Sequence, residues 1–313
     1  MLRFTLKRLA SGIILLVVVA TGTFFLAHLA IGDPTAGLLG NSATPAQQAA
    51  LAEKIGIDRP VLVQFADWAR HAVVGDFGDS WRNFQPVTAQ IATKLPVTLS
   101  VVAAAILLSA VFGGLLGVLA GLNPGTIIDK LVKAAAVVLF ALPGFWVSLV
   151  LVIWFGVNLK WFPAVGYVQP TMSIEGWLRS ITLPAVSLAL GAVVMIAEQL
   201  RNAFISVNGQ DFVRTLRSRG LSQTRVVVHL LRNAAPASIT ILALMFVALL
   251  SGAIVVEQVF ALPGIGAMTN GSSQNGDIPI LLGITVISVA FVVIVNFLLD
   301  VVLGWINPKA RVK

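Results

Sequence analysis

Residues 201–235 read RNAFISVNGQDFVRTLRSRGLSQTRVVVHLLRNAA, a polar and basic stretch that separates two strongly apolar ones. In its first half, apolar residues recur at spacings of three to five positions, which is typical of one face of a helix. We therefore predict a single helix through this half. The residues on that face are Phe204, Val207, Phe212 and Leu216.

Gly220 interrupts this pattern, and Ser222 is placed to begin a second helix as its N-cap. Glycine adopts the left-handed conformation without the Cβ clash of other residues, so the pattern predicts two helices joined at a kink. The second helix has an apolar side made of Val226, Val227, Leu230 and Leu231. Such an elbow can project from a membrane toward an acidic partner. The alternative is an amphipathic helix that lies in the lipid interface.

The rest of the chain is apolar enough to be a membrane protein. Of its 313 residues 58% are hydrophobic and only 11% are charged, and the mean hydropathy is +0.94. Soluble domains are about half apolar and a quarter charged. The composition therefore excludes disorder and an ordinary cytosolic enzyme. The absence of cysteine excludes disulfides and thiolate metal sites.

Six apolar runs predict an all-α membrane protein with six transmembrane helices, since about 20 apolar residues cross a bilayer. The runs cover residues 9–31, 95–122, 131–157, 181–199, 236–256 and 280–306. With six spans both termini lie on one side. That side carries 14 basic residues and the other side 7, so both termini are predicted to be cytoplasmic. The net charge of +8 then follows from topology, and no nucleic acid partner is expected.

Residues 32–95 are too long for a plain connection and are predicted to form an external helical segment. Thr44 and Gln47 have the spacing of a capping box, and Gly56 is placed to end that helix. A second helix follows Pro60 and a third follows Pro86. The segment is expected to pack on the outer ends of the spans, the alternative being a lid or docking surface. Three further polar residues are predicted to be solvated surface, not a metal site: His71, Asp76 and Asp79.

Residues 211–222 (DFVRTLRSRGLS) and 229–236 (HLLRNAAP) together resemble the EAA loop of permease subunits in binding-protein-dependent ABC importers. The chain is most similar to the B-type subunits of dipeptide, oligopeptide and nickel permeases. The similarity runs nearly the full length. Other matching motifs are GDFGDS at 75–80, PGFW at 143–146, TLPA at 182–185, VVEQVF at 255–260 and LPGIG at 262–266.

The resemblance implies a type I ABC importer permease fold in a bacterial or archaeal cytoplasmic membrane. Its expected parts are a tail and first span at 1–31, the external segment at 32–95, a permease core at 96–306 and a tail at 307–313. The expected partners are a second homologous permease, one or two kinds of cytoplasmic ATPase and an external binding protein. The coupling loop that contacts the ATPase would use Asp211, Arg214, Arg217, Arg219, Gly220, Leu221, Ser222 and Arg225.

The chain has no Gly-x-x-x-x-Gly-Lys phosphate loop, so we expect a transport subunit that is not itself an enzyme. No cofactor is expected on it, and ATP and Mg²⁺ would bind the partner subunits of an ATP-hydrolysing complex. Peptides delivered by the binding protein are the expected substrate. Dipeptides, oligopeptides, glutathione-like peptides and nickel complexes stay open within the family.

A few polar residues lie within the spans, where each is costly. Glu257, Asn296 and Asp300 are candidate gate or pathway residues. For Asp300 a structural ion pair with Lys309 or Arg311 is the favoured interpretation, and Glu198 is expected to pair with Arg201. The alternative function is a secondary transporter driven by an ion gradient, a class that often has internal repeats and midmembrane charges. The sequence shows no convincing repeat.

Overall fold

The computed structural model describes residues 2–40 and 43–306. In this part of the chain the regular elements are helices, apart from one isolated bridge between Asp79 and Pro86. The helices, with two π-helical stretches η1 and η2, are α1 (Leu2–Ile31), α2 (Thr35–Leu39), α3 (Pro45–Ile55), α4 (Val61–Val73), α5 (Val87–Leu108), η1 (Ser109–Gly113), α6 (Gly114–Leu122), α7 (Ile127–Ala141), α8 (Gly144–Leu151), η2 (Val152–Asn158), α9 (Ile174–Asn208), α10 (Asp211–Ser218), α11 (Gln223–Val259), α12 (Ile265–Asn275) and α13 (Ile278–Ile306).

The helices form two compact units. Within the described residues, the core unit comprises Leu99–Leu262 and 294–306. The N-terminal unit comprises Leu2–Thr98 and Pro263–Val293. Both α5 and α13 contribute to each unit, because the divisions fall within these two helices.

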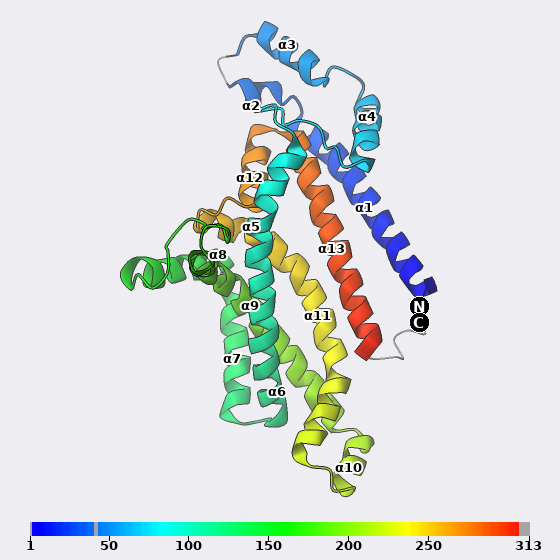
Figure 1. Cartoon of the computed structure of the whole chain (residues 1–313), viewed down its shortest axis with the longest axis vertical. Helices are drawn as coiled ribbons and strands as arrows, with labels where there is room; N and C mark the ends of the chain where they lie inside the picture. Colours follow the sequence, from blue (N-terminus) through cyan, green and yellow to red (C-terminus); the bar gives the residue numbers. More distant parts are fainter. Residues whose placement is uncertain (1, 41–42, 307–313) are drawn as a thin grey trace. The chain divides into compact units, whose positions relative to one another are not determined.

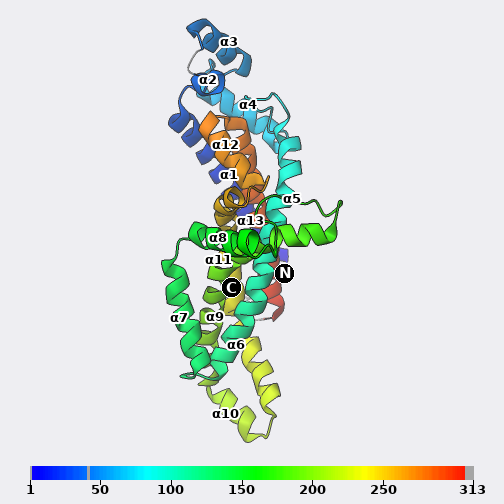
Figure 2. The ribbon, with the colours of Figure 1, turned by 90° about the vertical axis from the view of Figure 1, so that its left-hand side faces the viewer.

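Among the described residues five helices are long and apolar enough to cross a membrane, namely Arg8–Ile31, Val87–Leu122, Ile174–Asn208, Gln223–Val259 and Ile278–Leu303. A sixth span is formed only if Ile127–Leu139 and Gly144–Asn158 are counted together, and these are bent by 103°. In Figure 2, α8 accordingly runs across the direction of α7. The predicted span at 131–157 therefore corresponds to two helices with a sharp bend between them. The helix breaks at Leu142, whose ψ is 130°, because the residue before a proline disfavours helical geometry.

Helix α9 is the centre of the core unit and contacts α6, α7, α8, α11 and η1. Three glycines, Gly113, Gly117 and Gly121, lie four residues apart and face it. A methyl group at Gly117 would lie 2.7 Å from the carbonyl oxygen of Ala197, and one at Gly113 equally close to that of Val193. Small residues let the two backbones approach, as at other helix interfaces in membranes.

In the N-terminal unit, α4 packs its apolar side on the C-terminal part of α1 and the N-terminal part of α13. Phe24 of α1 is buried and lies 5.2 Å from the ring of Phe65 and 5.7 Å from that of Trp68. Ile278 and Leu282 of α13 complete this cluster. The segment thus packs on the ends of two apolar helices, while its location outside the membrane stays a prediction.

The local signals of the external segment also agree with the structure. Thr44 and Gln47 form the predicted capping box at the start of α3, and Gly56 ends that helix in the left-handed conformation with φ of 74°. Helix α5 begins directly after Pro86 and runs through Pro96. The predicted third external helix and the second span are therefore one continuous helix.

Helix α11 differs from the prediction in a similar way. We expected Pro236 to begin the fifth span, but α11 runs without a break from Gln223 to Val259 and has Pro236 inside it. A proline removes one hydrogen bond from a helix, and helices in membranes tolerate this loss. The second helix of the elbow and the fifth apolar span are one element.

Candidate functional site

The candidate site is the elbow around α10, which joins α9 to α11. Figure 1 shows α10 at one end of this helix pair. Helix α9 ends at Asn208, and α10 starts at Asp211 after Gln210 adopts an extended ψ of 149°. The prediction of one helix through Phe204, Val207, Phe212 and Leu216 is therefore wrong. Gly209 is a weak helix former, and Asp211 stabilises a new N-terminus by its charge.

The turn after α10 depends on Gly220. Its φ is +74°, and a Cβ built there would meet nothing within 4 Å. Glycine is thus required by the left-handed backbone rather than by lack of space. The amides of Gly220 and Leu221 close the turn on the carbonyls of Arg217 and Leu216 at 3.0 and 3.3 Å. The predicted kink is confirmed. Ser222 precedes α11 as expected, but its hydroxyl makes no capping bond.

A small apolar core holds the elbow in shape. Phe204 of α9, Val213 of α10, and Val226 and Leu230 of α11 are each 0% exposed. Val213 is the one fully buried residue of α10, while Phe212 and Leu216 pack against the same core. Full burial of such side chains contributes roughly 1.5–3 kcal/mol each. The apolar residues of α10 therefore face the protein itself.

The outer surface of the elbow is charged and mostly basic. The exposed residues include Asp211, Arg214, Arg217, Arg219, Gly220, Ser222 and Arg225, and Leu221 is half-buried. Asp211 and Arg214 approach to 3.6 Å, and their side chains are 96% and 79% exposed. Such an exposed pair contributes little to stability. Arg217 donates to the side-chain oxygen of Asn208 at 2.8 Å. The exposed charge of the elbow is thus mainly positive.

A buried ion pair that the sequence did not predict lies about two turns before the C-terminal end of α9, at the base of the elbow. Two nitrogens of Arg201 bond the carboxylate of Asp129, with Nη2 at 3.1 Å from Oδ2. The Asp129 side chain is only 2% exposed and also accepts from the amide of Gly125 at 2.8 Å. Lys133 approaches it to 3.5 Å. The expected pair of Arg201 with Glu198 is wrong, because Arg201 reaches across to α7 instead.

The ion pair matters to the elbow because of its position. Arg201 is one helical turn before Phe204, which belongs to the apolar core of the elbow. Asp129 is in the first turn of α7 and also holds the preceding loop through Gly125. The pair therefore fastens the α6–α7 loop to the base of the helix that carries the elbow.

The three candidate pathway residues lie on two helices, Glu257 on α11 and Asn296 and Asp300 on α13. Glu257 is completely buried near the end of α11, where its carbonyl oxygen accepts from the amide of Leu262 at 2.8 Å. Asn296 and Asp300 are half-buried and four residues apart on α13, as expected. Lys309 and Arg311, the expected partners of Asp300, lie outside the described residues. The role of these residues in transport stays a prediction.

Comparisons with known proteins cover nearly the whole chain. The profile of the family described as binding-protein-dependent transport system inner membrane component matches residues 113–312. The profile of its N-terminal part matches residues 1–102. A putative peptide transport system permease protein of Brucella abortus (strain 2308) is 36% identical over 308 residues, which are 98% of each chain. A di/tripeptide transport system permease protein of Pseudomonas aeruginosa (strain UCBPP-PA14) is 32% identical over 333 residues, or 99% of each chain.

The fold is also similar to a solved structure. One chain of the MetNI methionine ABC transporter, in an inward-facing conformation, aligns with a TM-score of 0.52 and 17% identity. The alignment covers 69% of this chain and 96% of that one. At this identity the similarity concerns the fold alone.

Proposed function

The chain belongs to the family of binding-protein-dependent transport system inner membrane components, and on this premise we propose that it is a permease subunit of an ATP-driven peptide importer. It forms half of the translocation pathway, and a second, homologous permease forms the other half. Relatives named as peptide permeases over 98% or more of both chains support the choice of substrate.

The observation that carries the proposal is the construction of the elbow. Helix α10 buries Val213 fully, and Phe212 and Leu216 partly, in a core shared with α9 and α11, which leaves little apolar surface for lipid. This argues against an amphipathic helix in the lipid interface, which needs a free apolar face. What the elbow offers outward is arginine, whose fork of donors suits carboxylates on a protein partner. We assign this partner as the cytoplasmic ATPase, with the stretch from Gly220 to Arg225 in contact with it.

The division of labour follows from this assignment. The sequence has no phosphate loop, so ATP and Mg²⁺ bind the ATPase subunits and this chain binds no cofactor. An external binding protein delivers the peptide on the other side of a bacterial or archaeal cytoplasmic membrane. Both termini and α10 then lie on the cytoplasmic side, in keeping with the arginine-rich elbow. Closure of the ATPases moves the elbow, and this movement opens the translocation pathway to one side of the membrane and then to the other.

Two measurements test this function. Uptake of labelled di-, tri- and oligopeptides is compared in cells with the complete transporter and in cells without this chain. We expect uptake of at least one peptide class to be lost and to be restored by the chain. In proteoliposomes of the assembled complex, transport should require ATP and resist a protonophore. Transport by this chain alone, driven by a proton or sodium gradient without ATP, would establish the secondary transporter instead.

A further inference from the structure

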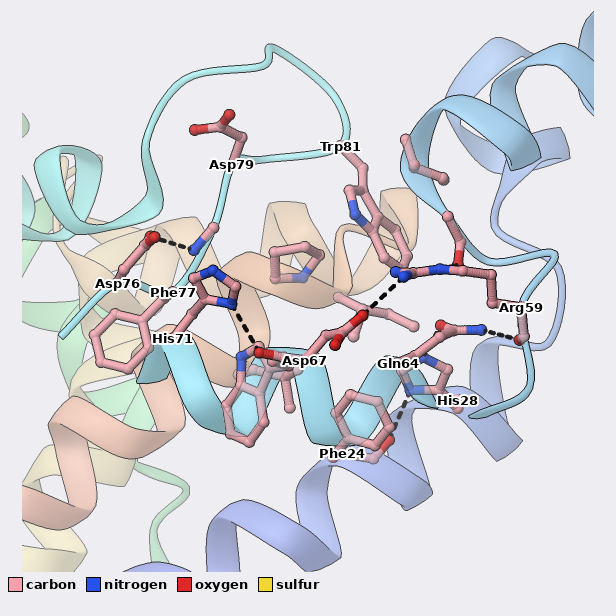
Figure 3. Close-up of a pocket in the computed structure, with 17 residues that line it drawn as sticks. Phe24, His28, Arg59, Gln64, Asp67, His71, Asp76, Phe77, Asp79 and Trp81 are labelled. Carbon is pink, nitrogen blue, oxygen red and sulfur yellow. Dashed lines mark hydrogen bonds and ion pairs between the residues drawn. The ribbon is translucent and has the colours of Figure 1, made fainter. Parts of the chain in front are cut away.

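The N-terminal unit contains an open cavity that the proposed function does not use. It has a volume of about 520 Å³ and lies between α4 and the loop at 76–81. Figure 3 shows Gln64, Asp67 and His71 on the helix side, with Trp81 on the loop side. Sites for small ligands commonly have volumes of about 300–1,000 Å³. The cavity is thus large enough for a small organic molecule.

The charges that line the cavity do not cancel. Arg59 and Asp67 form an ion pair at 2.7 Å, which neutralises both. Asp76 and Asp79 also line the cavity, and within residues 2–40 and 43–306 neither has a basic partner. They are exposed, as the sequence predicted. The uncompensated charge of the cavity is therefore negative, and it favours a cationic ligand.

Two hydrogen-bond acceptors are available beside this charge. Asp76 uses one carboxylate oxygen to accept from the amide of Gly78 at 2.9 Å, which leaves its other oxygen for a ligand. His71 lies between Asp67 and Asp76 in Figure 3, and its Nδ1 is 2.8 Å from the carbonyl oxygen of Asp67. Nδ1 must carry the hydrogen in that bond. Nε2 of the neutral ring is then an acceptor.

Aromatic rings supply part of the remaining walls. Phe24, Phe77 and Trp81 all line the cavity. Aromatic faces attract organic cations, and tryptophan does so most strongly. Among the described residues there is no group of three His, Asp or Glu side chains that could hold a metal ion. The combination fits an organic cation with several N–H donors better than a metal ion.

We propose that this cavity binds a primary ammonium group, the N-terminal ammonium of a peptide. Its N–H groups donate to Asp76 and to Nε2 of His71, and the adjoining residue of the peptide lies against the aromatic walls. The choice of a peptide as the source rests on the proposed function. A polyamine carries the same ammonium group and is the other source. The residues of the site all belong to the N-terminal unit, and none of them is an elbow residue or a candidate pathway residue.

The test uses the full chain in lipid nanodiscs without any partner. Binding of trialanine, N-acetyltrialanine and spermidine is measured by isothermal titration. Acetylation removes the charge and two donors, so we expect it to weaken binding by about tenfold or more. Asp76→Asn keeps the oxygen that accepts from Gly78 but removes the charge, and should weaken trialanine binding about fivefold. His71→Phe keeps the ring, removes Nε2 and provides a second, independent variant.

Asp58→Asn is the matched control, because Asp58 is an exposed carboxylate of the same segment that does not line the cavity. It should bind trialanine like the unchanged chain. Binding of spermidine without trialanine would keep the ammonium site and make a polyamine its ligand. Equal binding of acetylated and free trialanine, or no binding by either ammonium ligand, would overturn the proposal. This binding measurement uses no ATPase and no transport step. Its outcome is therefore independent of the uptake experiment that tests the proposed function.

Discussion

Arg201 and Asp129 are 72 positions apart and form a two-pronged ion pair at the base of the helix that carries the elbow. Both side chains are withdrawn from water, with exposures of 11% and 2%. Desolvation makes such a pair an uncertain source of stability, but the loss of one partner leaves a buried charge without compensation. The pair therefore connects α7 to α9. Replacing one of the two residues should destabilise the fold more than replacing both.

The first prediction concerns this fastening. Arg201→Met should lower the melting temperature of the purified chain by several degrees, because Asp129 then keeps only the amide of Gly125 and the half-exposed Lys133, which is 3.5 Å away. Adding Asp129→Leu should recover part of the loss, since the uncompensated charge is gone. The measurement is thermal unfolding in detergent, followed by size-exclusion chromatography.

Glu175→Gln is the control for this series, because its pair with Arg179 is exposed and should contribute almost nothing. If the double variant is less stable than Arg201→Met alone, Asp129 has a stabilising role that does not depend on the arginine, and the paired fastening is wrong.

The second prediction concerns the contact of α6 with α9. Gly117→Ala should destabilise the chain by about 1–3 kcal/mol, because the new methyl group meets backbone atoms of Ala197 at 2.7 and 3.1 Å. Gly114→Ala is matched in chemistry and lies in the same helix, but its methyl group meets nothing within 4 Å. It should be neutral or slightly stabilising, since alanine is the better helix former. Equal unfolding of the two variants would mean that α6 and α9 can separate freely.

A third prediction concerns Ser80 and Asp277, which bond at 2.5 Å across 197 positions of the chain. Asp277 also accepts from the amide of Trp81, whereas Ser80 accepts from the amides of Arg82 and Asn83. Asp277→Asn should therefore speed hydrogen exchange at Trp81 first. Ser80→Ala should speed exchange at Arg82 and Asn83.

Thr93→Ala serves as the control, because the Thr93 hydroxyl bonds only its own helix, at the carbonyl of Gln90. It should leave all three amides unchanged. Unaltered exchange in both Asp277→Asn and Ser80→Ala would show that other contacts hold this loop.

The parts of the molecule that the sequence predicted are those with short-range causes. The cap of α3 joins residues three apart, and the turn at Gly220 is a property of one backbone position. Apolar runs located the spans for the same reason. The two long-range contacts could not be predicted from the sequence. Arg201 and Asp129, like Ser80 and Asp277, become neighbours only in the folded chain.

The errors have equally local reasons. Pro236 predicts the start of a helix because proline is favoured in the first turn. In the structure it lies inside α11. Hydropathy does not predict the break at Leu142, because the helices on both sides of it are apolar. The hydropathy of a segment contains no information about the direction in which its helix runs. In the site, the elbow was recognised from its glycine and arginines. The sequence predicts the apolar residues of its core correctly. It wrongly places Phe204, Val207 and Phe212 on a single helix, whereas α9 ends before Phe212.

The last prediction tests whether the elbow works through its shape. Gly220→Val should abolish peptide uptake and co-purification of the ATPase while the chain still inserts, because a β-branched residue at φ of +74° is strained by about 1–3 kcal/mol. Gly220→Asn should retain most of both activities, because asparagine tolerates the left-handed conformation. Space is open there, so side-chain size does not distinguish the two variants. Uptake and co-purification are measured in the same membranes at equal chain content. Equal loss in both variants would mean that the partner contacts the glycine itself, and full activity of Gly220→Val would remove the elbow from the coupling mechanism.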